Sequence, residues 1–93
     1  MDENRVAVIS IIVEEEEAAP ALNAVIHEYA GCVVSRMGTT LRKTRGISVI
    51  CLVVDAPADI ISAFSGKIGR VKGVSVKTTY SAVKGQKGEA NAD

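Results

Sequence analysis

Four short apolar runs along the chain predict β-strands. Each run is rich in β-branched residues, which pack well on a pleated surface, and turn-forming or charged residues bound it. The first run reads VAVISIIV and ends at an acidic segment. The predicted strands cover residues 6–13, 32–41, 46–54 and 74–80.

Two amphipathic stretches between these runs predict helices. Pro20 fixes the start of the first helix, because proline is tolerated only in the first turn. Asp55 is the predicted N-cap of the second helix, with Pro57 in its first turn and Gly69 at its end. Apolar residues at helical spacing define the buried stripes, which are Leu22, Val25, Ile26 and Tyr29 in the first helix and Ile60, Ile61, Phe64 and Ile68 in the second.

The order βαββαβ predicts a ferredoxin-like α+β fold. Right-handed connections then give a four-stranded antiparallel sheet in the spatial order 4-1-3-2, with both helices on one face. With 93 residues the chain has room for one domain, which we place at residues 1–80. Residues 81–93 are small and polar, and we expect a flexible C-terminal tail.

The two central strands are apolar on both faces. A sheet with one face in water normally alternates apolar and polar residues. Here only Ser10 and Ser48 are polar in the central-strand positions 6–13 and 47–54. Two helices cover one face only, so the other face predicts packing against a second subunit. Taking the serines as markers of that interface, we assign to it Val6, Val8, Ser10, Ile12, Ser48, Ile50 and Leu52. A homodimer and a homotetramer both remain open.

Composition narrows the class of protein. A neutral chain with 47% hydrophobic residues can bury a core, and no apolar run is long enough for a membrane helix. The N-terminal residues are acidic and polar, unlike a signal peptide. Two cysteines are too few for a disulfide scaffold. We therefore expect a cytoplasmic protein that does not bind membranes.

Charge is distributed unevenly along the chain. Residues 1–30 carry a net charge of −6 and residues 31–88 a net charge of +8. The predicted topology brings an acidic loop, residues 14–17, to the same end as two basic segments, residues 42–45 and 67–73. These charges either neutralise one another or form a bipolar surface for a charged partner or an anion.

No catalytic or metal-binding set is identifiable in the sequence. The predicted first and third strands have no aromatic residue, which argues against an RNA-recognition motif. Cys32 and Cys51 fall at positions of opposite parity on paired strands, so they are expected on opposite faces as small hydrophobic residues. His27, the only histidine, is expected on the solvent side of its helix. We predict no catalytic residues, no metal and no cofactor.

A glycine-rich segment over residues 65–73 is the exception to this lack of motifs. Helix termination explains Gly69, and a tight turn with positive φ explains Gly73. Gly66 lies inside the predicted helix, where glycine costs about 1 kcal/mol relative to alanine. It therefore indicates close approach by a strand, a subunit or a ligand.

Residues 64–78, FSGKIGRVKGVSVKT, resemble the closing motif of the small iron-only hydrogenase system regulator family. Arg36-Met37-Gly38 and the Val-Glu exit of the first strand are similar to the family as well. The resemblance implies a fold close to ACT domains and to the C-terminal domain of the nickel-responsive repressor. It also implies association with hydrogenase maturation or expression. Without a DNA-reading helical motif, direct DNA binding is not expected.

Two functions therefore remain as predictions, and a small enzyme ranks last. The first is a non-enzymatic, oligomeric regulatory module that binds hydrogenase maturation or regulatory proteins. The second is an ACT-like sensor of a small molecule or metal, with its site between subunits. Candidate ligand-binding residues for either function are Arg36, Gly66, Lys67, Gly69 and Gly73.

Overall fold

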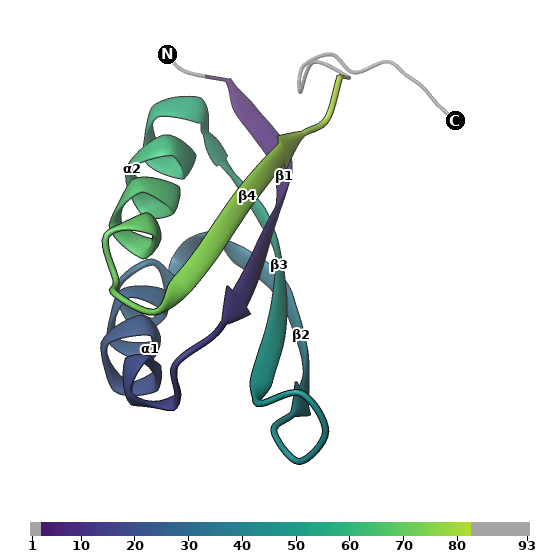
Figure 1. Cartoon of the computed structure of the whole chain (residues 1–93). Coiled ribbons are helices and arrows are strands. Elements are labelled where there is room, and N and C mark those ends of the chain that lie inside the picture. Colours follow the sequence, from purple (N-terminus) through teal and green to yellow (C-terminus); the bar gives the residue numbers. More distant parts are fainter. Residues whose placement is uncertain (1–2, 83–93) are drawn as a thin grey trace.

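The structure, a computed structural model, describes residues 3–82. Two helices pack on one face of a four-stranded antiparallel sheet whose order is β2-β3-β1-β4 (Figure 1). The predicted fold class and strand order are confirmed. The elements are β1 (Asn4–Val13), η1 (Glu16–Ala18), α1 (Ala19–Glu28), η2 (Ala30–Cys32), β2 (Val33–Leu41), β3 (Ile47–Pro57), α2 (Ala58–Gly69) and β4 (Val74–Tyr80).

The hydrophobic core lies between the sheet and the helices. Alternate residues of β1 point into it, because successive side chains of a strand point to opposite faces. From β1 these are Ala7, Ile9, Ile11 and Val13, each at most 3% exposed. The helices contribute most of the predicted stripes, with Leu22 and Ile26 from α1 and Ile61, Phe64 and Ile68 from α2 buried. Ile60 was predicted to be buried with them, but it is 37% exposed. Full burial of each large side chain contributes about 1.5–3 kcal/mol.

The second helix begins later than predicted. Asp55 is a strand residue of β3, paired with Val6, and Pro57 occupies the N-cap position of α2. β3 keeps pairing with β1 as far as the partners Asn4 and Pro57, so the helix can start only at Ala58. The side chain of Asp59 accepts a hydrogen bond from the Ile60 N–H in the first turn. Asp59, and not the predicted Asp55, is therefore the aspartate that accepts a backbone hydrogen bond at the start of α2.

Two turns with positive φ shape one end of the molecule. Gly46, at φ 74°, closes the β2–β3 hairpin, and Gly73, at φ 91°, leads into β4. The Gly73 carbonyl accepts hydrogen bonds from the backbone N–H groups of Glu14 and Glu15. The acidic loop after β1 is thereby fixed to the basic turn after α2. No helix among the described residues is long and apolar enough to cross a bilayer.

Candidate functional site

The outer sheet face, which is the face turned away from the helices, is largely apolar. From β1 it presents Val6, Val8, Ser10 and Ile12, and the three hydrophobic residues are 45%, 38% and 39% exposed. Cross-strand partners share a face, which adds Val49, Cys51, Val53 and Asp55 from β3. The predicted position of the β1 residues on the uncovered face is confirmed.

The predicted face of three β3 residues is wrong. Leu52 is fully buried beneath the helices, Ile50 packs against the core, and Ser48 pairs with buried Val13. The reason is the register, in which an even-numbered residue of β1 opposes an odd-numbered residue of β3. Ser48 lies near the hairpin, where its hydroxyl hydrogen-bonds the Thr40 hydroxyl at 3.3 Å. A polar residue at a strand end does not mark the outer face.

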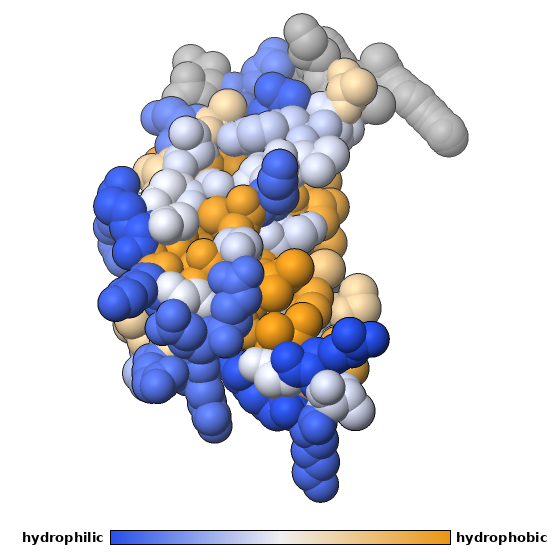
Figure 2. All heavy atoms as spheres, in the orientation of Figure 1, coloured by the Kyte–Doolittle hydropathy of each residue, from blue (hydrophilic) through white to orange (hydrophobic). Residues whose placement is uncertain are grey.

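The edge strands extend the outer sheet face in different ways. β2 adds Met37 and Leu41, which are 68% and 40% exposed. β4 adds the polar residues Ser75, Lys77 and Thr79. The apolar part is therefore centred on β3 and runs from β2 to β1. Figure 2 shows hydrophobic residues reaching the surface, while charged side chains gather around the helices and at the hairpin end.

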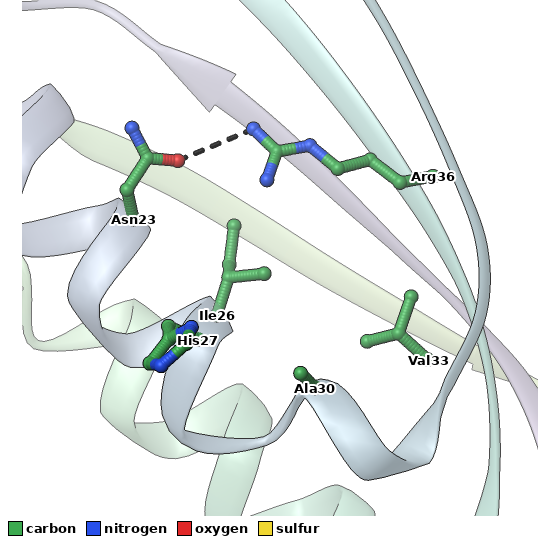
Figure 3. A pocket seen from close by; sticks show the side chains of 6 residues that line it. All are labelled: Asn23, Ile26, His27, Ala30, Val33 and Arg36. Atoms are coloured by element: carbon green, nitrogen blue, oxygen red, sulfur yellow. Dashed lines mark hydrogen bonds between the residues drawn. The ribbon is translucent and has the colours of Figure 1, made fainter.

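A first groove lies between α1 and β2. It has a volume of about 490 Å³ and is lined by Asn23, Ile26, His27, Ala30, Val33 and Arg36. Arg36 reaches across from β2, and its Nη2 donates a hydrogen bond to Asn23 Oδ1 at 3.2 Å (Figure 3). A guanidinium has five N–H donors in a planar fork, so further donors remain for a carboxylate or phosphate group.

A second groove, of about 420 Å³, lies on the other side of α1. Its acidic wall comes from Glu15 and Glu17, before α1. Its basic wall comes from Lys67, Arg70 and Lys72, at the end of α2 and in the turn that follows. The predicted meeting of the acidic loop with the α2 exit is therefore observed. No ion pair among residues 3–82 joins the two walls of this groove, because the ion pair found there joins Lys67 to Glu28.

Lys67 is held by two neighbours at the end of α1, Glu28 and the C-cap residue Tyr29. Its Nζ lies 2.7 Å from Glu28 Oε2 and 5.4 Å from the centre of the Tyr29 ring. The hydrogen bond to the Glu28 carboxylate raises the pKa of the Lys67 ammonium above its usual value. Tyr29 in turn stacks on Phe64, with ring centroids 4.5 Å apart. Lys67 thus links the two helices at the surface.

The three glycines among the predicted ligand-binding residues have different surroundings. A Cβ at Gly69 would touch Val76 at 3.4 Å, so this glycine brings α2 close to β4. A Cβ at Gly73 would lie 2.8 Å from the Glu15 Cβ. A Cβ at Gly66 would meet only the Arg70 guanidinium, at 3.9 Å, so no strand among residues 3–82 comes within 4 Å of it. Gly69 and Gly73 therefore have structural roles.

The predicted ligand-binding residues do not form a single site. Arg36 lines the groove between α1 and β2, whereas Lys67 lines the groove beside Glu15. Asn23 and His27 were not predicted to line a groove with Arg36. The sequence gives no signal for this, because the groove exists only where α1 leaves the edge strand uncovered. His27 is exposed, as expected.

The described residues contain no group of three His, Cys, Asp or Glu side chains placed to hold a metal ion. Both thiols are free. Cys32 packs against the core on the helix side, whereas Cys51 lies on the outer sheet face as the cross-strand partner of Ser10 and Met37.

Comparison with known proteins places this geometry in a family. Residues 5–78 match the family model "TM1266-like: Iron-only hydrogenase system regulator, putative". The uncharacterized protein TM1266 from Thermotoga maritima is 33% identical, with a TM-score of 0.78 over 84% of this chain and 98% of that one. The ACT domain of a GTP pyrophosphokinase from Chlorobium tepidum, at 17% identity, has a TM-score of 0.63 over 86% of this chain and 89% of that one.

The similarity to the ACT domain, at 17% identity, shows the fold alone. A search of curated proteins found no significant match. The family model spans most of the sequence, from β1 to β4, and the Thermotoga maritima protein is covered almost completely. The chain therefore belongs to the TM1266-like family, which is described as one of iron-only hydrogenase system regulators.

Proposed function

We propose that this protein is a non-enzymatic regulatory module of the iron-only hydrogenase system, which works in the cytoplasm as a homo-oligomer and acts by binding a partner protein. The family description supports the regulatory role and the link to hydrogenase. The observation that carries the oligomeric part is the apolar outer sheet face, where Val6, Val8 and Ile12 are each more than a third exposed.

The energy available from covering this face is large. Four strands spaced about 4.8 Å apart, over about eight residues at 3.3 Å each, give a face on the order of 500 Å². If half of it is apolar, two copies together hide about 500 Å² of apolar surface. At about 25 cal/mol per Å² this contributes on the order of 10 kcal/mol. Association costs about 4–15 kcal/mol, so self-association is feasible at cellular concentrations.

Replacement of Val8 by aspartate tests the oligomer. Sedimentation equilibrium at micromolar concentration should show an oligomer for the wild-type protein and a monomer for Val8→Asp, because a carboxylate cannot be buried there unpaired. Ser62→Asp is the control, since Ser62 is exposed on α2. A monomeric wild-type protein contradicts the oligomeric proposal.

A cellular experiment tests the link to hydrogenase. In a host strain that lacks this protein, iron-only hydrogenase activity and the transcript levels of its maturation genes should change several-fold. Complementation with wild type or Ser62→Asp should restore both, and complementation with Val8→Asp should not. Unchanged activity and transcripts in the deletion strain would remove the regulatory proposal, whatever the oligomeric state.

A small-molecule sensor is the second candidate, favoured by the groove between α1 and β2. Arg36 there faces an apolar floor formed by Ile26, Ala30 and Val33, which suits an amphipathic carboxylate. Thermal-shift measurements against amino acids, nucleotides and divalent metals test this function, because a ligand at one hundred times its Kd stabilises by about 2.7 kcal/mol. Arg36→Gln should abolish the shift and Arg70→Gln should not. If Arg70→Gln alone abolishes it, the ligand binds in the other groove.

A further inference from the structure

The free edge of β2 differs from the other edge of the sheet. All of β2 after Val33 is exposed, because the helices do not cover it. A strand at the edge of a sheet presents unpaired N–H and C=O groups that can accept another strand. The register irregularity between Val33 and Ser35 is confined to the start of the strand, so residues 35–41 pair regularly with β3. This leaves about seven residues of regular edge.

The two faces of β2 have different chemistry. On the outer side Met37 and Leu41 extend the apolar surface of β3. On the helix side Arg36 is the cross-strand partner of buried Leu52 and lies in the groove beside α1. β4 has no such division, because its outer residues are polar. A segment that pairs with β2 would therefore meet Met37 and Leu41, together with Ser35 and Thr39, on one face and a guanidinium on the other.

The part of the chain around this edge is uniformly basic. Residues 29–54 contain four basic side chains, Arg36, Arg42, Lys43 and Arg45, and no acidic one. The turn that ends β2 carries three of the four. The ion pair found among the described residues lies elsewhere, between Lys67 and Glu28. The positive charge at this edge is thus available to a partner.

From these observations we infer that the β2 edge binds an extended acidic segment of a partner protein as a fifth strand. The segment would alternate apolar and acidic residues, with the apolar ones beside Met37 and Leu41 and an acidic one beside Arg36. Further carboxylates at one end would contact the hairpin. This inference rests on the proposed role in partner binding and adds the chemistry of the partner.

Charge and exposed apolar side chains also favour an acidic peptide segment at the β2 edge over a second copy of this chain or a nucleic acid. A second copy paired through its own β2 would bring two basic edges together, and like charges on adjacent strands are destabilising. A nucleic acid would satisfy the cations, but it offers nothing to the exposed Met37 and Leu41.

A labelled peptide of alternating valine and glutamate, eight residues long, is the probe. Fluorescence anisotropy at low salt should show saturable binding by the full chain and at least tenfold weaker binding of the valine–lysine peptide. Arg36→Gln combined with Arg45→Gln should weaken binding of the glutamate peptide at least tenfold. Lys77→Gln, on the opposite edge strand, should leave binding unchanged. Equal binding of both peptides, or none, overturns the inference.

Hydrogen exchange distinguishes strand addition from loose charge attraction. Binding should slow amide exchange in residues 33–41 and leave exchange in residues 74–80 unchanged. Binding without protection of β2 contradicts the inference, as does tighter binding of a short DNA duplex than of the peptide. Dissociation of the oligomer by the peptide would show that β2 is a subunit contact, which also overturns it. None of these results changes the sedimentation and hydrogenase tests of the proposed function.

Discussion

Alanine at Gly73 should destabilise the protein much more than alanine at Gly46, although both glycines have positive φ. The left-handed conformation costs a non-glycine residue about 1–2 kcal/mol, and reduced freedom of the unfolded chain returns about 0.4–1 kcal/mol. A methyl group added at Gly46 would meet open space, so Gly46→Ala should cost about 1 kcal/mol in total.

Gly73 has an additional contact that Gly46 lacks. Its new methyl group would lie 2.8 Å from the Glu15 Cβ, an atom fixed to the backbone that cannot rotate away. The Gly73 carbonyl also holds the N–H groups of Glu14 and Glu15, at 2.8 Å and 3.2 Å, so the two segments cannot separate freely. Overpacking of this kind costs about 1–3 kcal/mol, which brings the expected loss for Gly73→Ala to about 3 kcal/mol.

Urea unfolding followed by circular dichroism measures these losses, at one fixed protein concentration because association also affects stability. Gly31→Ala, at a site with ordinary φ and open space, is the neutral control. Adding Glu15→Gly to Gly73→Ala should recover the part of the loss due to the clash, whereas Glu15→Ala should not, because it keeps the Cβ. Equal losses at Gly73 and Gly46 would refute the contact-based reasoning.

Two further predictions concern β3 and the helix surface. Leu52→Ala should cost about 2–5 kcal/mol of unfolding free energy, measured in urea, because Leu52 is buried. Val53→Ala, on the outer sheet face, should cost under about 1 kcal/mol and mainly weaken self-association in sedimentation. The reverse order of losses would show that the register of β3 is wrong. Glu28→Gln should lower stability at about pH 8, because Lys67 has a raised pKa in the folded state and its stabilising effect is complete below the unfolded-state pKa. The difference between Glu28→Gln and wild type should vanish as the pH rises through the raised pKa, and a difference that persists at high pH would contradict this origin.

The fold could be predicted because its signals are local. Strand runs, the two helical stripes and the turn glycine at Gly73 each act over a few residues, and together they admit one topology. The start of α2 could not be predicted, because it depends on how far β3 keeps pairing with β1. Asp55 is a good N-cap in isolation, but the pairing of β3 extends past it to Pro57.

The face of β3 was mispredicted for a related reason. When both faces of a strand are apolar, the sequence contains no alternation that fixes its register, and a shift of one residue exchanges the faces. Ser48 suggested an outer position, yet it lies on the helix side near the hairpin, where its hydroxyl hydrogen-bonds the Thr40 hydroxyl. The groove that unites Asn23 with Arg36 likewise depends on where α1 lies over the sheet, which no short motif encodes.

The hydrogen bonds at the end of β4 indicate how the chain could be circularly permuted. The Ser81 N–H donates a hydrogen bond to the Val6 carbonyl. The Arg5 guanidinium donates a hydrogen bond of 2.9 Å to the Ser81 carbonyl, and it also lies over the Tyr80 ring. The first and last described segments therefore lie together, at the end opposite the β2–β3 hairpin (Figure 1). A circular permutant that joins these segments with a short linker and begins within residues 42–45 would keep every strand neighbour, and it would turn the basic hairpin into a pair of free chain ends.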